Sequence, residues 1–242
     1  MELILGSRSP RRQELLERMG LRFTVLSADI DETKYETEDP ETSVCRICEA
    51  KARAVAQRLR REHSQSSILN SQLVLSSDTI VVLDGKILGK PHDEAEARAM
   101  LRALSGREHA VYTAFTLLPV EASGIRQQAT GDGGTDCHDQ SADWSRNDKA
   151  ENTSPAAAAA FTHCEKTAVK FRELTEAEIA AYVASGEPMD KAGAYGIQGL
   201  GAMLVEAIRG DYFTVMGLPV CRLAQTLKRY GIDPLSMQEK KL

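Results

Sequence analysis

Two arginines follow a serine and a proline near the start of the sequence, in the segment Ser7–Arg12. Ser9 suits the N-cap of a helix and Pro10 suits the first helical position. Arg11 and Arg12 then fall in the first turn, where cations are unfavourable because the helix N-terminus already carries positive partial charge. A bound phosphate would remove this conflict, since backbone N–H groups, guanidinium groups and a serine hydroxyl all favour an anion. The alternative is a pair of solvated surface arginines.

One carboxylate, that of Asp78, lies inside a run of strand-forming residues, Leu73–Leu83. A charge near the interior is unfavourable unless a cation, a metal ion or hydrogen-bond donors accompany it. A metal-binding or water-activating role fits such a carboxylate. The alternative is a solvated aspartate at a tight turn between two strands.

The segment Gly85–Pro91 resembles a phosphate-binding P-loop but departs from it at two points. Three residues separate its glycines where the P-loop has four, and Pro91 stands where the P-loop has Ser or Thr. The segment is therefore not expected to be a Walker site. Lys90 could still act as a point charge for a phosphate group, or it could be a solvated lysine in a turn.

Four glycines lie close together in the segment Asp190–Gly201. Such spacing predicts unusual backbone angles or a close approach to a ligand. A strand-like run, Met203–Ile208, follows where a dinucleotide-binding motif would begin a helix, so that motif is not expected. Gln198 stands between glycines and could present its amide to the edge of a base. The alternative is a purely structural loop.

The overall composition excludes several classes of protein. The formal net charge of −5 argues against a surface that coats nucleic acid, but not against a local basic pocket. No apolar run approaches the length of a transmembrane helix, and the start of the chain has no secretory signal pattern. Five cysteines, an odd number, predict reduced thiols and a cytoplasmic protein. Cys48 lies on the apolar face of a predicted helix, which favours core packing over zinc binding.

Strand-like and helix-like segments alternate along the chain, which predicts an α/β fold. A polar segment between Val120 and Ala160 cannot bury enough apolar surface to offset the entropy of ordering, so it is expected to be a disordered loop inserted in a hairpin-like connection. The expected strands are Leu3–Leu5, Phe23–Leu26, Leu73–Leu83 (as one or two strands), Val111–Leu118, Thr167–Phe171 and Met203–Ile208. The expected helices are Ser9–Met19, Pro40–Arg60, Asp93–Leu104, Thr175–Val183 and Pro219–Tyr230.

Taken together, these motifs resemble the Maf family of nucleoside triphosphate pyrophosphatases. The resemblance covers residues 2–118 and 167–231 and leaves out the segment at about 120–166, where the family usually has a short connection. The matching motifs are Ser7-x-Ser9-Pro10-Arg11-Arg12, Asp29-Ile30-Asp31-Glu32-Thr33, Glu49-Ala50-Lys51-Ala52, Ser77-Asp78-Thr79-Ile80-Val81, Leu88-Gly89-Lys90-Pro91, Leu104-Ser105-Gly106 and Asp190-Lys191-Ala192-Gly193-Ala194-Tyr195-Gly196-Ile197-Gln198-Gly199.

The resemblance implies an elongated mixed sheet with flanking helices and two lobes around a cleft, related to the inosine triphosphatases. It implies a single domain over residues 1–242, with a disordered insertion at about 120–166. It also implies hydrolysis of a nucleoside triphosphate to the monophosphate and pyrophosphate with a divalent cation, Mg²⁺ or Mn²⁺. A homodimer is common in such folds, and the sequence leaves the oligomeric state open.

The family pattern also implies roles for individual residues. Asp78 would be the base for the attacking water and a metal ligand, and Glu32 would assist with the metal or the water. Lys51 would act beside Asp78 in catalysis and hold phosphate. The other phosphate-binding residues implied are Ser7, Arg11, Arg12 and Lys90.

Three positions divide the family by the base it prefers, and they correspond to Arg11, Thr79 and Gln198. This set resembles the subgroup that acts on dTTP, UTP and modified uridine triphosphates. A Gln198 amide can both donate to and accept from a pyrimidine edge. Three alternatives stay open at this point: a pyrophosphatase of the 7-methyl-GTP type, a nucleotide-binding regulator of cell division with little turnover, and an α/β domain that binds phosphorylated metabolites without selectivity.

Overall fold

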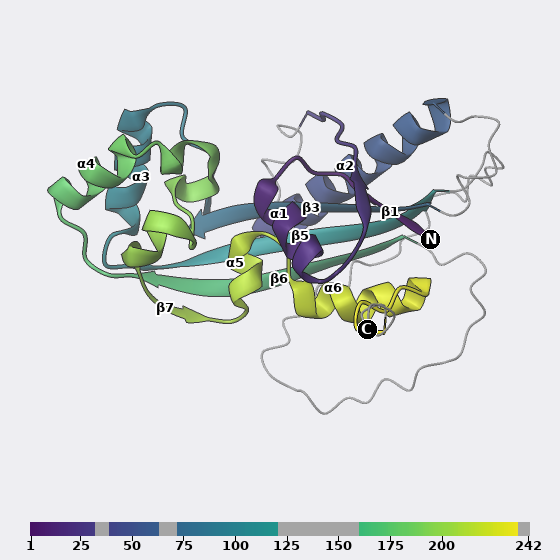
Figure 1. The fold of residues 1–242 in the computed structure, drawn as a ribbon. Helices are drawn as coiled ribbons and strands as arrows, with labels where there is room; N and C mark the ends of the chain where they lie inside the picture. The colour runs from purple at the N-terminus through teal and green to yellow at the C-terminus, as the bar shows by residue number, and fades with distance from the viewer. Residues whose placement is uncertain (32–38, 63–71, 121–159, 237–242) are drawn as a thin grey trace.

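The computed structural model describes residues 1–31, 39–62, 72–120 and 160–236. Strands and helices alternate, as the sequence predicts (Figure 1). The strands are β1 (Glu2–Leu5), β2 (Phe23–Val25), β3 (Gln72–Leu83), β4 (Lys86–Leu88), β5 (Glu108–Val120), β6 (Phe161–Phe171) and β7 (Val205–Arg209). The α-helices are α1 (Pro10–Arg18), α2 (Pro40–Glu62), α3 (Glu94–Leu104), α4 (Glu176–Ala184), α5 (Tyr212–Met216) and α6 (Val220–Leu227). Short 3₁₀ turns lie at Glu187–Asp190, Ala192–Ala194, Gly199–Leu204 and Lys228–Tyr230.

The strands form one mixed sheet of seven strands in the order β2-β1-β3-β5-β6-β7, and β4 pairs with β3 off this path. β1 is parallel to β2 and to β3, and the pairs among β3, β5, β6 and β7 are antiparallel. β3 and β5 run side by side from Gln72 to Val82 and form the long spine visible in Figure 1. The fold class expected from the sequence, an elongated mixed sheet with flanking helices, is confirmed.

The two faces of β3 meet different helices because side chains alternate along a strand. Val74, Ile80 and Val82 pack in clusters with residues of α2, which covers one face. Leu73 and Leu75, on the other face, pack with α1 and α6. On this second face the far end of β3 packs against α3 and α4 in a separate cluster. The two helix groups lie at opposite ends of the sheet and give the molecule its two lobes (Figure 1).

One edge of β3 is open in the middle of the strand. β1 pairs with it as far as Leu75, and β4 pairs with it from Val81 onward on the same side, since β5 occupies the other edge. Between these two points, no described strand pairs with this edge. A short turn at Asp84 and Gly85 allows β4 to fold back on β3, and both residues have positive φ angles of 51° and 75°. An Asp-Gly pair suits such a two-residue hairpin.

The predicted start of the first helix is confirmed, since Ser9 is the N-cap of α1 and Pro10 its first residue. Side chains also cap two other helices. Asp93 caps α3 by accepting from the backbone N–H of Glu96. Thr175 and Glu178 form a capping box at α4.

The structure corrects three expectations. β3 is one continuous strand, so the interpretation of Asp78 as a turn residue is wrong. β6 begins at Phe161, so residues 161–166 belong to the sheet and not to a loop; their pairing with β5 overrides the low apolar content of the segment. The short helix α5 was not expected, because its five residues carry too short a pattern to read.

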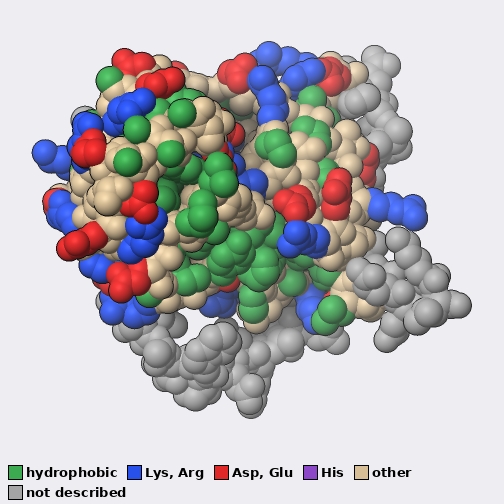
Figure 2. Space-filling model, turned by 60° about the vertical axis from the view of Figure 1, so that its left-hand side comes forward, with side chains coloured by type: hydrophobic (Ala, Val, Ile, Leu, Met, Phe, Trp, Pro, Cys, Tyr) green, Lys and Arg blue, Asp and Glu red, His purple; other side chains and the backbone are tan. Residues whose placement is uncertain are grey.

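The molecular face in Figure 2 carries apolar side chains at its centre and interspersed acidic and basic side chains around them. Within the described residues, no helix is both long enough and apolar enough to cross a membrane. The cysteines in the described ranges, Cys45, Cys48, Cys164 and Cys221, carry thiols and form no disulfide bond.

A buried histidine makes the stability of this fold dependent on pH. His109 is only 4% exposed, and its ring meets Phe171 and Tyr195 edge to face at 5.1 and 5.3 Å between ring centroids. Burial lowers the pKa of His109 from 6.5 to about 4. The folded protein therefore binds fewer protons than the unfolded chain between these values, and stability falls as the pH falls through this window.

We expect the free energy of unfolding to fall by about 2 kcal/mol between pH 7 and pH 5 through His109 alone. His109→Gln removes the ionisable group, so urea unfolding of this variant should show a smaller loss over the same pH range. His92→Gln, at an exposed position, serves as the control and should keep the wild-type pH dependence. An unchanged pH dependence in His109→Gln would contradict the assignment.

Candidate functional site

A pocket of about 460 Å³ lies where the edge of β3 is open. Its lining comes from both lobes and from both faces of the sheet. Because no described strand pairs with β3 along this stretch of edge, Asp78 on the α2 face and Thr79 on the opposite face both reach the same space. The lining includes Gly6–Arg12, Ser27–Ile30, Lys51, Ser77–Thr79, Val81, Lys90, Val111, Asp190–Ala192, Tyr195–Gln198 and Val215–Gly217.

The charge of this pocket is opposite in sign to that of the whole chain. The chain as a whole has a formal net charge of −5. The pocket lining includes only three acidic side chains, those of Asp29, Asp78 and Asp190, against six basic ones. The basic residues are Arg8, Arg11, Arg12, Lys51, Lys90 and Lys191. Such a concentration of cations in one cleft favours an anionic ligand.

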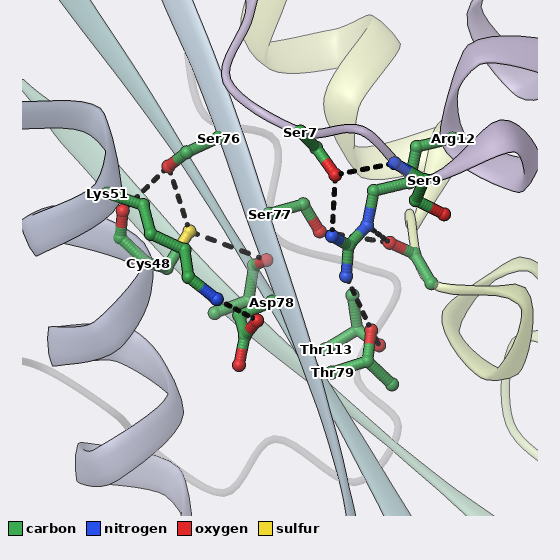
Figure 3. Close-up of polar contacts among 12 residues, drawn as sticks. Ser7, Ser9, Arg12, Cys48, Lys51, Ser76, Ser77, Asp78, Thr79 and Thr113 are labelled. Atoms are coloured by element: carbon green, nitrogen blue, oxygen red, sulfur yellow. Dashed lines mark hydrogen bonds and ion pairs between the residues drawn. The ribbon is translucent and has the colours of Figure 1, made fainter. Parts of the chain in front are cut away.

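Arg12 is held at the centre of the pocket wall by three elements. Its Nε donates to the carbonyl oxygen of Gly217 at 2.8 Å, and its terminal nitrogens donate to Ser7 Oγ at 3.0 Å and Thr79 Oγ1 at 3.1 Å (Figure 3). The interpretation of Arg12 as a solvated surface arginine is therefore wrong. Arg11 also lines the pocket, and its guanidinium lies 4.0 Å from the carboxylate of Asp190.

Ser7 lies at the turn between β1 and α1 and is buried. Its hydroxyl accepts from the backbone N–H of Ser9, at 3.3 Å, as well as from Arg12. The first turn of α1 holds no acidic residue, and Ser9 makes no side-chain cap. The N-terminus of α1 thus faces the pocket with arginines in place of the acidic residues that usually balance a helix N-terminus.

Asp78 and Lys51 form a half-buried ion pair across β3 and α2. Lys51 Nζ lies 2.7 Å from Asp78 Oδ1, and the two side chains are 18% and 14% exposed. Asp78 also lines the pocket. The sequence analysis left a cation, a metal ion or hydrogen-bond donors open as partners of this carboxylate, and the structure supplies a cation, Lys51.

A buried contact one turn along α2 fixes the position of Lys51. The Cys48 thiol lies 3.2 Å from Ser76 Oγ, and the Ser76 hydroxyl donates to the carbonyl of Cys48 at 2.7 Å. Burial raises the pKa of the Cys48 thiol to about 11, so it stays protonated at neutral pH. Cys48 is a packing residue, as its place on the helix predicted. Its contact with Ser76 docks α2 against β3 at a position two residues before Asp78.

Lys90 and Gln198 enter the pocket from the lobe of α3 and α4. A backbone hydrogen bond from Gly193 N–H to the Gly89 carbonyl, 3.0 Å long, joins their two loops. Gly193 has a φ of 67°, and a Cβ there would lie 2.9 Å from a methyl group of Val81. Gly193 is one of the glycines predicted to approach a ligand, and the structure shows that it instead packs closely against Val81. Glu32 lies outside the described residues.

The pocket contains residues that the sequence did not single out. Gly217 ends α5 with a φ of 113°, and its carbonyl accepts from Ser77 Oγ at 2.9 Å as well as from Arg12. Gly217 precedes Leu218 and Pro219, a glycine-then-proline pattern that marks helix ends and could have predicted this turn. Lys191 also lines the pocket, next to Asp190.

The residues present fit a divalent cation that the ligand helps to coordinate. No cluster of three or more His, Cys, Asp or Glu side chains able to hold a metal ion occurs in the described part of the chain. Mg²⁺ is usually held by one or two carboxylates together with substrate phosphates and water. Asp78, with an oxygen facing the pocket, supplies a carboxylate of this kind.

Comparison with known proteins decides the family. The family model described as Maf-like protein matches residues 2–141 and 145–230. The chain belongs to the Maf family. This match extends through much of the segment at 120–166, which the motifs alone left outside the resemblance.

Named relatives cover nearly the whole chain. A dTTP/UTP pyrophosphatase of Moorella thermoacetica is 42% identical over 96% of each chain. Proteins of the same name from Geobacillus sp. (strain WCH70) and Clostridioides difficile are 43% and 41% identical, and each alignment covers 95% of this chain, with 98% and 95% of the relative. A nucleoside-triphosphatase / dITP/XTP pyrophosphatase structure from Mycobacterium abscessus matches 96% of both chains at 12% identity and a TM-score of 0.36.

Gly217 provides a test of how this Maf-family site is held together. A Cβ at position 217 would lie 3.3 Å from Thr79 Oγ1 and 3.5 Å from Arg12 Nε, on a backbone that L-residues rarely adopt. We expect Gly217→Ala to lower the free energy of unfolding by about 2–3 kcal/mol, measured by urea denaturation.

The matched control is Gly231→Ala. Gly231 also has a positive φ, 74°, but its Cβ would meet nothing within 4 Å. That variant should lose only about 1 kcal/mol. Equal losses in the two variants would show that the packing around Gly217 does not matter.

Proposed function

We propose that this Maf-family protein hydrolyses dTTP and UTP, and modified pyrimidine triphosphates, to the nucleoside monophosphate and pyrophosphate. One observation of the structure carries the proposal: a net positive pocket in an acidic protein, with a carboxylate and a lysine paired at its base. The names of the relatives, dTTP/UTP pyrophosphatase, support the same reaction and the same substrates.

The two ends of the pocket suit the two ends of a nucleotide. Ser7, Arg11 and Arg12 supply a hydroxyl and two guanidinium groups beside the N-terminus of α1, and Lys51 and Lys90 add two point charges. These groups suit a triphosphate. Apolar side chains line the other part of the pocket and suit the flat faces of a base, with Gln198 at its edge: Val81, Val111, Tyr195, Ile197 and Val215.

The chemistry that we assign to Asp78 follows from its two oxygens. One oxygen accepts from Lys51, which holds the carboxylate in a fixed orientation. The other oxygen can accept a proton from a water molecule that attacks the α-phosphorus, so that the bond between the α- and β-phosphates breaks and pyrophosphate leaves. Arg11, Arg12 and Lys90 then stabilise the negative charge that develops on the departing pyrophosphate.

A divalent cation, Mg²⁺ or Mn²⁺, fits this scheme. Asp78 would hold it together with phosphate oxygens of the substrate, and Glu32 would be a second carboxylate for the metal or for the water. Bound there, the cation would neutralise phosphate charge and orient the triphosphate.

Base selection is the finer part of the proposal. Arg11, Thr79 and Gln198 all line the pocket, and the Gln198 amide can pair with the imide edge of thymine or uracil. A preference for 7-methyl-GTP is the competing outcome. A nucleotide-binding regulator of cell division would bind the same nucleotides with little turnover.

The remaining expectations stay proposals. We propose that residues 1–242 form one domain with an insertion at about 120–166, and that the protein works in the cytoplasm without nucleic acid or membrane partners. The described cysteines, which carry thiols and form no disulfide bond, support a reducing compartment. We also propose a homodimer, which the size of the protein in solution would test.

We expect the purified protein with Mg²⁺ or Mn²⁺ to release pyrophosphate and monophosphate from dTTP and UTP, when tested against CTP, 7-methyl-GTP, ITP and GTP. Asp78→Asn should lower kcat by at least about 10²-fold, since the amide cannot take a proton from water. Its circular dichroism spectrum should match the wild type.

Asp84→Asn is the matched control for Asp78→Asn. Asp84 pairs with Arg107 at an exposed turn of the same hairpin, outside the pocket lining, so this variant should keep wild-type turnover. Full activity in Asp78→Asn would refute the mechanism. Hydrolysis of 7-methyl-GTP alone would refute the base preference, and binding without turnover would favour the regulator.

A further inference from the structure

A chain of three hydrogen bonds runs behind the pocket, from Arg12 through two threonines to the backbone of α5. Arg12 lies 3.1 Å from Thr79 Oγ1, and Thr79 Oγ1 lies 2.9 Å from Thr113 Oγ1. Thr113 Oγ1 donates to the carbonyl of Thr214 at 2.7 Å. Figure 3 shows Arg12, Thr79 and Thr113 in this order. Thr113 and Thr214 have no solvent exposure.

The register of the sheet builds this chain. Thr79 on β3 and Thr113 on β5 are directly opposite partners, so their side chains lie on the same face and within reach of each other. The Thr214 carbonyl is supplied by α5, and Asp211 fixes the start of that helix by accepting from the backbone N–H of Phe213 and Thr214. The contact is thus fixed by strand pairing and by a capped helix.

Counting hydrogens fixes the direction of every bond in the chain. A guanidinium group can only donate, a carbonyl can only accept, and a threonine hydroxyl has one hydrogen. The hydrogen of Thr113 goes to the Thr214 carbonyl, so Thr113 must accept from Thr79. The hydrogen of Thr79 is therefore used, and its oxygen already accepts from Arg12. What Thr79 has left for a ligand is a second acceptor site.

We propose that Thr113 is a positioning residue that makes the Thr79 hydroxyl a pure hydrogen-bond acceptor toward the base of the substrate. The inference rests on the proposed function. On the same face of the sheet, Val81 and Val111 follow as the next cross-strand pair and begin the apolar part of the pocket, so Thr79 lies at the border between the cations and the surface that suits a base.

An acceptor at this border discriminates between pyrimidines. The imide N3 of uracil and thymine carries a hydrogen that Thr79 can accept, whereas N3 of cytosine presents a lone pair. A lone pair facing an oxygen with no hydrogen to give is repelled and left unpaired, which disfavours cytosine. Thr113 thereby acts on base choice although Thr79 lies between it and the pocket.

The test compares Thr113→Val with Thr113→Ser. Valine has nearly the shape of threonine but neither accepts nor donates, so it releases the Thr79 hydrogen, which can then be offered to cytosine. We expect the UTP-to-CTP ratio of kcat/KM to fall about tenfold, through KM more than through kcat. Thr113→Ser keeps the hydroxyl and should restore the wild-type ratio.

Thr116→Val is the matched control. Thr116 is a buried threonine on the same strand, 2% exposed, and it bonds to Cys48 and Thr162 and does not line the pocket. Its loss should alter stability but leave the ratio unchanged. A ratio that stays the same in Thr113→Val, or that falls equally in Thr116→Val, would overturn the proposal.

Binding separates this inference from the proposed function. Dissociation constants of the non-hydrolysable α,β-methylene analogues of UTP and CTP report base choice without turnover, and the same fall in their ratio is expected. Wild-type selectivity in binding without any hydrolysis of UTP would refute the enzyme but not the role of Thr113.

A measurement on the wild type covers the case in which Thr113→Val does not fold. In proton NMR spectra, the slowly exchanging Thr79 hydroxyl hydrogen should show contacts to the side chain of Thr113. A Thr113 hydroxyl hydrogen pointing to Thr79 would contradict the proposed direction.

Discussion

The site depends on the open edge of β3 between the end of β1 and the start of β4. A fully paired strand would keep the side chains of its two faces in separate compartments. Here Asp78, which faces α2, and Thr79, which faces α1 and α5, reach one pocket because no described strand stands between them. β5 pairs with the other edge along this whole stretch, so the strand stays straight and its residues stay in register.

The helices around this edge hold opposite charges in place before any ligand arrives. α2 brings Lys51 to Asp78 and is docked by the buried contact between Cys48 and Ser76. α5 brings the Gly217 carbonyl to Arg12 and Ser77. Removing either Lys51 or Asp78 would leave the other as a poorly solvated charge. Such buried ion pairs add little to stability, and here the pair instead fixes the positions of two groups of the site. An anionic ligand meets cations whose positions are already fixed.

Much of this arrangement could be predicted from the sequence because it rests on local patterns. The Ser9-Pro10 start of α1, the capping box at Thr175 and the buried run around Asp78 each have a local physical cause. The pairing of Thr79 with Thr113 could not be predicted, since it depends on the register between strands about 35 residues apart. The pairing of Lys51 with Asp78 likewise depends on how α2 packs across the sheet. The start of β6 at Phe161 was missed because strand pairing, and not composition, orders residues 161–166.

The most direct test of the account is a crystal structure with the α,β-methylene analogue of UTP and Mg²⁺. The account predicts a triphosphate against Ser7, Arg11 and Arg12, with Asp78 at the α-phosphate and the base against Val81 and Val111. A nucleotide bound elsewhere on the molecule, or bound here with the base among the arginines, would contradict it.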